Sequence, residues 1–470
     1  MPRHLLIASL CLLSLPAPAA TRVACVGTSI TSPAGIETSR CYPARLQALL
    51  GTGYLTQNFG SDGATLLRKG TRPYIRQKEF ARARAFLPDI VFIELGTSDS
   101  KPQNRVLLAD FEADYGALID SFRTLTTKPR IITLLPPPLF TEDSAGISDR
   151  VVRDEIIPMI RQVAFAKGCE VVNLYNFFLG MSDCFPDRVH PSLRGAEMIA
   201  SRLHELLTME EEPLNLIASA HLEGTHSSYH GFDCLSFTFR GREAKIAFPK
   251  RVARGRPWIW RARFWGHEPQ TEIALLERGF HVAYCDVSEL FGNDEALSIW
   301  QEFYLMLTGG GLSPKAALEG FSRGGIYVYR WAATYPSSVA CVYADAPVLD
   351  LKSWPGGKGK SHGNPELWKE FRKDFRLATE ADALAFTGNP LDLAPRIAKG
   401  GYPMLHICGD ADETVPIEEN TDLFEKAIRA GGGDITVVRK PGVGHHPHSL
   451  ANPGLIVDFI LRATRRANHE

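Results

Sequence analysis

Gly320-Phe321-Ser322-Arg323-Gly324 begins at the end of a strand-like stretch, residues 316–320, and precedes a segment of helical period, residues 326–334. Glycines on both sides of the serine let the chain turn sharply from a strand into a helix. At the tip of such a turn the Ser322 hydroxyl is exposed. The backbone N–H of Arg323 then lies at the helix start, where the helix dipole favours an anion. This stretch predicts a parallel α/β sheet that presents Ser322 as a nucleophile.

Two later segments supply the groups that activate a serine. Asp412 follows the apolar run 404–407, with Asp410 as the alternative acid, and His445 follows a glycine-rich turn. The chain order serine, aspartate, histidine is the order that a strand–turn–helix serine site requires. We therefore expect Ser322, Asp412 and His445 to form a catalytic triad.

A second set of the same groups lies in the N-terminal half. Gly27-Thr28-Ser29-Ile30-Thr31 follows an apolar run, and Asp187-Arg188-Val189-His190 comes far downstream. A histidine three residues after an aspartate can take the serine proton through one ring nitrogen while the aspartate fixes the tautomer through the other. Ser29, His190 and Asp187 are thus predicted to form a second triad that shares no residue with the first.

Length and composition agree with two domains. A chain of 470 residues, 44% hydrophobic and 22% charged, is too long for one ordinary core. Its 52 basic and 53 acidic residues nearly cancel and are spread along the chain. This argues against nucleic acid or a membrane surface as a partner.

The first twenty residues predict a secretory signal peptide. Arg3 and His4 precede the apolar run 5–15, and small residues follow up to Ala20. No later run approaches about 18 apolar residues, so we expect a secreted or periplasmic protein without a membrane anchor. Beyond Cys11, eight cysteines remain, an even number that is compatible with disulfides of unreadable pairing.

Strand-like and helical segments alternate on both sides of a charged, proline-ended stretch. We predict a signal peptide at 1–20, an N-terminal domain at 21–208, a linker at 209–213 and a C-terminal domain at 214–470. Residues 352–390 break the alternation and predict a cap inserted over the active site.

The N-terminal motifs resemble those of the SGNH or GDSL hydrolase family over residues 22–208. This resemblance implies a flavodoxin-like sandwich around a parallel sheet, with Ser29 as the nucleophile. It also implies that Gly63, in Asn58-Phe59-Gly60-Ser61-Asp62-Gly63, joins Ser29 in donating to the oxyanion. In Gly96-Thr97-Ser98-Asp99, Ser98 stands where the family usually has asparagine, a longer donor to the oxyanion.

The C-terminal motifs resemble the α/β-hydrolase superfamily over residues 215–465. The resemblance implies that Arg323 supplies one oxyanion donor and that the loop after residues 258–265 supplies the other. Three histidines in residues 445–448 are also compatible with a metal site, but no carboxylate–histidine cluster is expected to complete it. We therefore assign neither a metal nor a cofactor.

Substrate-binding residues are predicted from aromatic side chains and charge. Tryptophans on the segments expected at the mouth and cap offer flat faces to sugars, although most tryptophans only pack. These are Trp258, Trp260, Trp265, Trp354 and Trp368. We single out Trp265, Trp354, His446 and Arg323 as substrate contacts. For Arg323 two readings stay open, a substrate carboxylate and an ion pair inside the domain.

These signals together are similar to those of bacterial carbohydrate esterases. The expected protein is a two-domain serine ester hydrolase that removes acetyl or other acyl groups from carbohydrates, or cleaves small esters, without a cofactor. One alternative is a single catalytic C-terminal domain with a non-catalytic, glycan-binding N-terminal domain. A lipase or peptidase is the other alternative.

Overall fold

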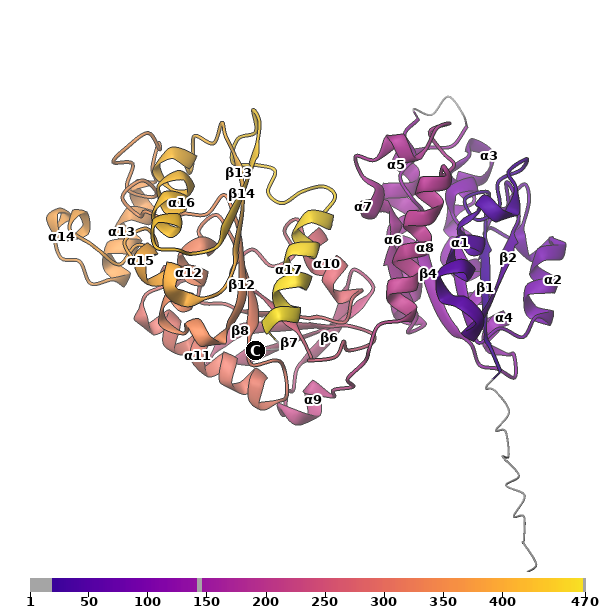
Figure 1. Ribbon diagram of the computed structural model, residues 1–470, viewed down its shortest axis with the longest axis horizontal. Coiled ribbons are helices and arrows are strands. Elements are labelled where there is room, and N and C mark those ends of the chain that lie inside the picture. The colour runs from indigo at the N-terminus through magenta and orange to yellow at the C-terminus, as the bar shows by residue number, and fades with distance from the viewer. Residues whose placement is uncertain (1–18, 142–145, 468–470) are drawn as a thin grey trace, which may run out of the picture.

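The computed structural model describes residues 19–141 and 146–467, so residues 1–18 of the predicted signal peptide lie outside the described residues. Within these ranges the chain forms two α/β domains, each with its own sheet (Figure 1). Helices long and apolar enough to cross a bilayer are absent from the described residues. The predicted fold class, α/β in two domains, is confirmed.

The N-terminal sheet has five parallel strands in the order β2-β1-β3-β4-β5, which is a flavodoxin-like order. The strands are β1 (Thr21–Gly27), β2 (Tyr54–Gly60), β3 (Ile90–Glu94), β4 (Arg130–Leu135) and β5 (Glu170–Asn173). Gly27 pairs with Gly60 on one side and Glu94 on the other, so three strands end together. The sequence did not predict β2, because this edge strand lacks the continuous apolar run of the buried strands.

Helices cover both faces of this sheet. One face packs against α1 (Tyr42–Leu50) and α8 (Leu193–Leu207). The other face packs against α2 (Lys78–Ala85), α4 (Phe111–Arg123) and α6 (Ile157–Ala166). Two apolar layers therefore stabilise the domain, one on each side of the sheet.

The C-terminal sheet has nine strands in the order β14-β13-β12-β11-β9-β10-β8-β7-β6. They are β6 (Thr225–Tyr229), β7 (Phe232–Phe239), β8 (Arg242–Phe248), β9 (Trp258–Arg261), β10 (His281–Cys285), β11 (Ala316–Phe321), β12 (Val339–Asp345), β13 (Met404–Gly409) and β14 (Ile435–Lys440). Strands β9 to β14 run parallel to one another. Strands β6, β7 and β8 pair antiparallel, and β8 also pairs antiparallel with β10. Residues 258–261 were expected near the site mouth, but they form a central strand.

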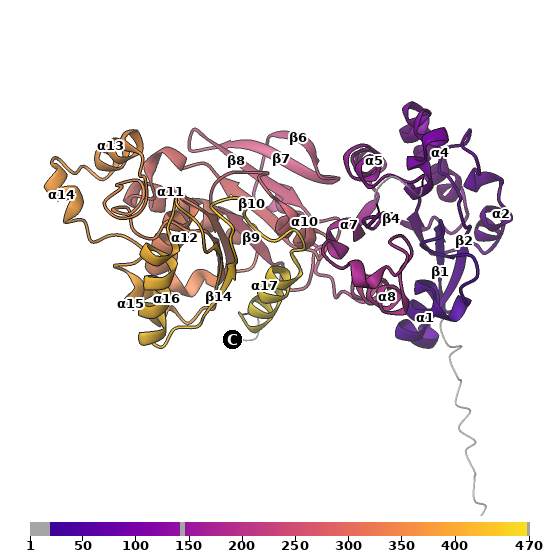
Figure 2. The same cartoon turned by 90° about the horizontal axis from the view of Figure 1, so that it is seen from above.

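Helices also cover both faces of the C-terminal sheet. One face packs against α10 (Gln270–Leu276) and α17 (Gly454–Ala467), and the other against α11 (Asp294–Gly309), α12 (Gly324–Thr334) and α16 (Thr421–Ala430). The segment between β12 and β13 contains α13 (Pro365–Asp374) and α14 (Glu380–Leu384). In Figures 1 and 2 these two helices lie at the end of the molecule farthest from the N-terminal domain.

A buried ion pair and several hydrogen bonds join the two domains. Arg202 on α8 lies 3.1 Å from Glu277, whose other carboxylate oxygen accepts the Asn173 N–H at 2.9 Å. Residues of the predicted linker also bond to the C-terminal domain, since the Glu212 N–H donates to the Val252 carbonyl. The eight cysteines in the described residues are all free, buried thiols.

Candidate active sites

Ser322 lies at the turn between β11 and α12, with a φ of 49°. The turn is so tight that a Cβ on Gly320 would come within 2.7 Å of the Gly324 carbonyl oxygen. A non-glycine residue with positive φ is held there by its surroundings, here by the Ser322 N–H bond to the Asp345 carbonyl at 2.8 Å. The sequence stretch that predicts a nucleophile turn therefore folds into one.

The predicted C-terminal triad is assembled. His445 Nε2 lies 2.9 Å from Ser322 Oγ, and His445 Nδ1 lies 2.7 Å from Asp412 Oδ2. Asp412 Oδ1 accepts the backbone N–H groups of Thr414 and Val415 at 2.9 and 2.8 Å, which fixes the carboxylate. The alternative acid, Asp410, instead accepts the Gly442 N–H at 2.6 Å. It supports the histidine loop and does not contact the ring.

Asp345 is a supporting residue that the sequence reasoning missed. Its carboxylate contacts His448 Nδ1 at 2.9 Å and accepts the Ser449 N–H at 2.7 Å. One residue thus ties the end of β12 to the histidine loop while its carbonyl holds the serine turn. The available signal was an aspartate directly after the apolar run 339–344, at the carboxyl end of a strand next to β11.

The predicted oxyanion donors of this site are backbone groups. Among the described residues the Arg323 N–H has no protein acceptor, and it stands at the first turn of α12. The loop after β9 borders the same turn, since a Cβ on Gly324 would lie 3.3 Å from Ala262 Cβ. An acyl oxygen held at Ser322 would therefore meet the start of α12 and this loop.

Ser29 occupies the corresponding place in the N-terminal domain, after the end of β1. The preceding residue, Thr28, donates its backbone N–H at 3.1 Å and its hydroxyl at 2.8 Å to the buried Glu94 carboxyl group. Burial raises the pKa of Glu94 to about 7, although these bonds act in the opposite direction. These bonds fix the backbone just before Ser29 to the buried Glu94 side chain.

Asp187 and His190 are in contact, with 2.6 Å between Asp187 Oδ2 and His190 Nδ1. Burial would raise the pKa of Asp187, but hydrogen bonds from the His190 N–H, the His190 ring and the Val189 N–H lower it. The pair is solvent-accessible, since the side chains of His190 and Asp187 are 32% and 56% exposed. Within the described residues no hydrogen bond joins His190 to Ser29, so this triad is only partly assembled.

The predicted oxyanion donors of the N-terminal site follow three adjacent strands. Ser29, Gly63 and Ser98 come after β1, β2 and β3, and the Ser29 and Gly63 N–H groups lack protein acceptors among the described residues. Ser98 is only 4% exposed, and its carbonyl accepts from Asn104 at 2.9 Å. Asp99 fixes the Gly63 loop by accepting the backbone N–H groups of residues 66 and 67, each at 2.9 Å. This anchor was not predicted.

Three tryptophans that were expected at the mouth and cap lie in the core instead. Trp258 and Trp260 are fully buried and stack on each other at 5.5 Å, so they belong to the core. Trp368 is buried and donates to Glu380. These three side chains fill space between helices and strands, as large apolar rings usually do. Trp265 is only partly buried and packs against Tyr229 at 4.7 Å, so its role as a substrate contact stays a prediction.

Trp354 and His446 lie beside the C-terminal triad. The Arg323 guanidinium lies 5.5 Å from the centre of the Trp354 ring, and the exposed His446 ring is 5.1 Å from that of His445. Trp354 is only 8% exposed and packs in the core of its domain, so His446 alone of the two offers an exposed side chain; both stay predicted contacts.

The expectation that no carboxylate completes the histidine cluster is wrong. Ligand atoms of His267, Glu268 and His446 lie within 4.8 Å of one another, and two imidazoles with a carboxylate suit Zn²⁺. No step at Ser322 requires them, because His445 is already bonded to both of its triad partners.

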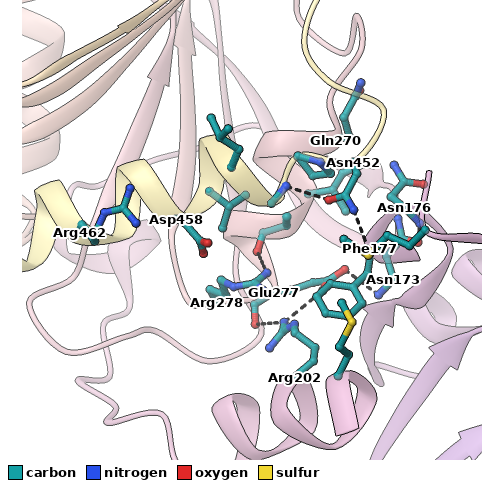
Figure 3. A pocket seen from close by; sticks show the side chains of 18 residues that line it. Asn173, Asn176, Phe177, Arg202, Gln270, Glu277, Arg278, Asn452, Asp458 and Arg462 are labelled. Carbon is teal, nitrogen blue, oxygen red and sulfur yellow. Dashed lines mark hydrogen bonds and ion pairs between the residues drawn. The ribbon is translucent and has the colours of Figure 1, made fainter. Parts of the chain in front are cut away.

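A cavity of about 630 Å³ lies between the domains, away from both serines. Figure 3 shows Arg202 and Asn173 converging on Glu277 in its wall, and Asn452 bonded to the backbone of Phe177. None of the predicted site residues lines this cavity. The hydrogen bonds within its wall join the two domains.

Comparison with known proteins identifies the first domain. Residues 25–198 match the GDSL-like lipase/acylhydrolase family, so the N-terminal region is a GDSL-like domain. An acetylxylan esterase of Xylanibacter ruminicola is 37% identical over 209 residues, which cover 40% of this chain and 43% of that protein. The chain therefore matches less than half the length of this relative.

Solved structures give partial similarities. A putative dipeptidyl aminopeptidase IV of Bacteroides ovatus has a TM-score of 0.37 at 15% identity, covering 52% of this chain and 36% of that one. An acylaminoacyl peptidase of Pyrococcus horikoshii has a TM-score of 0.36 at 15% identity, with 50% and 40% covered.

Proposed function

We propose that this protein is a secreted or periplasmic serine ester hydrolase with two sites, which removes acetyl or other acyl groups from carbohydrates. The observation that carries the proposal is the hydrogen-bonded chain Ser322–His445–Asp412, because ester cleavage by serine needs this relay. The GDSL-like identity of the N-terminal domain supports the second site.

At the C-terminal site, Ser322 Oγ attacks the ester carbonyl while His445 Nε2 takes its proton. Asp412 keeps the proton of His445 on Nδ1 and stabilises the imidazolium that forms. The N–H at the start of α12 donates to the oxyanion, which is charged only after attack, so it lowers the barrier selectively. His445 then returns the proton to the leaving alcohol, and water releases the acyl group by the same steps.

Carbohydrate is the proposed substrate class because 209 residues are 37% identical to an acetylxylan esterase. The apolar run 5–15 after Arg3 supports export. Fractionation of cells that express the full chain tests the export, and retention of the uncleaved chain in the cytoplasm would contradict it.

A second candidate function is a catalytic C-terminal domain with a glycan-binding N-terminal domain. The missing hydrogen bond between Ser29 and His190, and Ser98 in the oxyanion position, favour it. In that case the N-terminal domain would bind acylated glycans without cleaving them.

Serine replacement separates these candidates. Ser29→Ala, Ser322→Ala and the double variant are assayed on acetylated xylan, acetylated monosaccharides, a long-chain ester and a peptide. We expect each single variant to lose a separable deacetylase activity and the double variant to lose all activity. If Ser29→Ala leaves every activity unchanged, the N-terminal domain is a binding module. If only the long-chain ester or the peptide is cleaved, the carbohydrate assignment fails.

A further inference from the structure

Arg323, the residue after the nucleophile, has no acidic partner. Its guanidinium takes part in no hydrogen bond or ion pair among the described residues, although the side chain is half-buried. Arg330, seven residues further along α12, shows the usual arrangement, since it pairs with Asp294 at 3.0 Å. The reading of Arg323 as half of an internal ion pair therefore fails.

A second arginine lies against the same place. The guanidinium carbons of Arg263 and Arg323 lie 4.9 and 5.9 Å from the centre of the Phe264 ring. Arg263 donates to the carbonyl oxygen of Ser288 at 2.7 Å and also contacts the Tyr327 hydroxyl, while its Nε is buried without a partner. Two cations thus share one aromatic wall, and neither is paired with an acid.

The two positive charges destabilise each other. Burial and the nearby Arg263 lower the pKa of Arg323 to about 10, while Tyr327 and Glu370 act in the opposite direction. Arg323 therefore stays protonated at neutral pH although its surroundings disfavour the charge. An anion bound between these arginines would relieve that repulsion and occupy the free N–H donors.

This arginine pair borders the nucleophile. Arg323 follows Ser322 directly, and the loop that carries Arg263 touches the serine turn, as the 3.3 Å approach of Ala262 to a Cβ on Gly324 indicates. A substrate held with its ester carbonyl at Ser322 would place a neighbouring group between the two guanidinium groups.

We propose that Arg263 and Arg323 form a subsite for a substrate carboxylate, so that the C-terminal site prefers esters that carry a carboxylate group. This inference rests on the proposed function and names the substrate class of the Ser322 site. A guanidinium can bind a carboxylate through two parallel hydrogen bonds. The carboxylate can belong to the alcohol, as in an acetylated uronic acid, or to the acyl chain.

Matched ester pairs test the subsite and its source. The Ser29→Ala protein, in which only Ser322 acts, is assayed with acetylated methyl glucuronoside against acetylated methyl glucoside. The acyl-side arm uses mono-4-nitrophenyl adipate against 4-nitrophenyl hexanoate. We expect kcat/KM to favour the carboxylate member of one pair by about tenfold or more, and added NaCl to reduce this preference.

Arg263→Gln should reduce the preference ratio by about tenfold, whereas Arg330→Gln, which removes an acid-paired arginine from α12, should leave the ratio unchanged. Calorimetry on the Ser29→Ala/Ser322→Ala protein measures the binding of glucuronate against glucose and of adipate against hexanol. Binding of one carboxylate that Arg263→Gln abolishes is the expected result.

Each outcome has a distinct meaning. Hydrolysis of both members of every pair at equal kcat/KM would overturn the carboxylate subsite and leave the proposed esterase intact. Loss of all hydrolysis in the Ser29→Ala protein would overturn the esterase function of this site, and absence of carboxylate binding by calorimetry would then overturn the subsite as well. If Arg263→Gln lowers kcat/KM equally for neutral and charged esters, Arg263 has a structural role and the carboxylate subsite is overturned.

Discussion

Asp412→Asn should nearly abolish turnover at Ser322 through a change of histidine tautomer. Asp412 Oδ1 accepts two backbone N–H groups, at 2.9 and 2.8 Å, so the oxygen of an asparagine would take that position. Its amide NH2 would then face His445 Nδ1, where Oδ2 now lies at 2.7 Å. The ring would carry its proton on Nε2 and could not accept one from Ser322.

The expected loss in kcat is about ten-thousandfold, which corresponds to about 5.5 kcal/mol of barrier. Water cannot rescue the site, because the Asp412 side chain is only 2% exposed and that of His445 12%. Asp187→Asn changes the corresponding contact between aspartate and histidine in the N-terminal site. There the side chains of His190 and Asp187 are 32% and 56% exposed. Water can replace the lost acceptor, so we expect a smaller loss, on the order of a hundredfold.

The assay measures kcat for an acetate ester, with Asp412→Asn in the Ser29→Ala protein and Asp187→Asn in the Ser322→Ala protein. Circular dichroism checks that each variant is folded. A loss below tenfold for Asp412→Asn, or a larger loss for Asp187→Asn than for Asp412→Asn, would refute the tautomer argument.

Three further results are expected. Ser98→Asn should raise kcat at Ser29 about tenfold, because a longer donor reaches the oxyanion; a fall in kcat with an intact fold would show that Ser98 is already fitted to its role. Glu94 has a pKa raised to about 7, so its stabilising effect is complete below about pH 4.5 and is lost as the pH rises through 7. Glu94→Gln should therefore reduce the pH dependence of the unfolding free energy by up to about 1.4 kcal/mol per pH unit. The same pH dependence in the variant and the parent protein, measured by urea unfolding from pH 4 to 8, would contradict this. Glu277→Ala leaves the buried Arg202 with only the more exposed Glu205, 3.2 Å away, as a counter-charge and should cost up to about 3–5 kcal/mol of stability, measured by denaturant unfolding. The exposed pair of Glu210 and Arg254 is the control, since Glu210→Ala should change little; equal effects of the two variants would argue against a tight domain interface.

Local sequence was sufficient to predict both serine turns. Apolar runs followed by glycine and serine indicate a buried strand that ends in a tight turn, because only glycine tolerates the close approach at Gly320. Strands β1 and β11 were found in this way, whereas β9 was taken for part of the site mouth, and β2 and β6, whose side chains are largely exposed, were missed. Edge strands lack the apolar signal because only one of their faces is buried.

The choice between neighbouring acids needed tertiary structure. Asp410 and Asp412 are two residues apart in sequence, and only the path of the loop decides which carboxylate meets the His445 ring. The position of Asp345 at a strand end was a sequence signal, but its partner His448 lies about a hundred residues away, so only tertiary structure shows what it supports. The expectation that Trp258 and Trp260 lie at the site mouth failed because their burial depends on β9 being a central strand of the sheet.

The sequence by itself determined the two-domain α/β fold and the two sets of serine, histidine and aspartate, since these follow from local turn geometry and side-chain chemistry. Tertiary structure alone decided how complete each site is. It brought His445 to Ser322 while leaving His190 without a bond to Ser29, and it placed Arg263 beside Arg323 with no acid between them. Such pairings depend on how loops from strands far apart in the sequence pack together, and a local pattern of residues does not determine that packing.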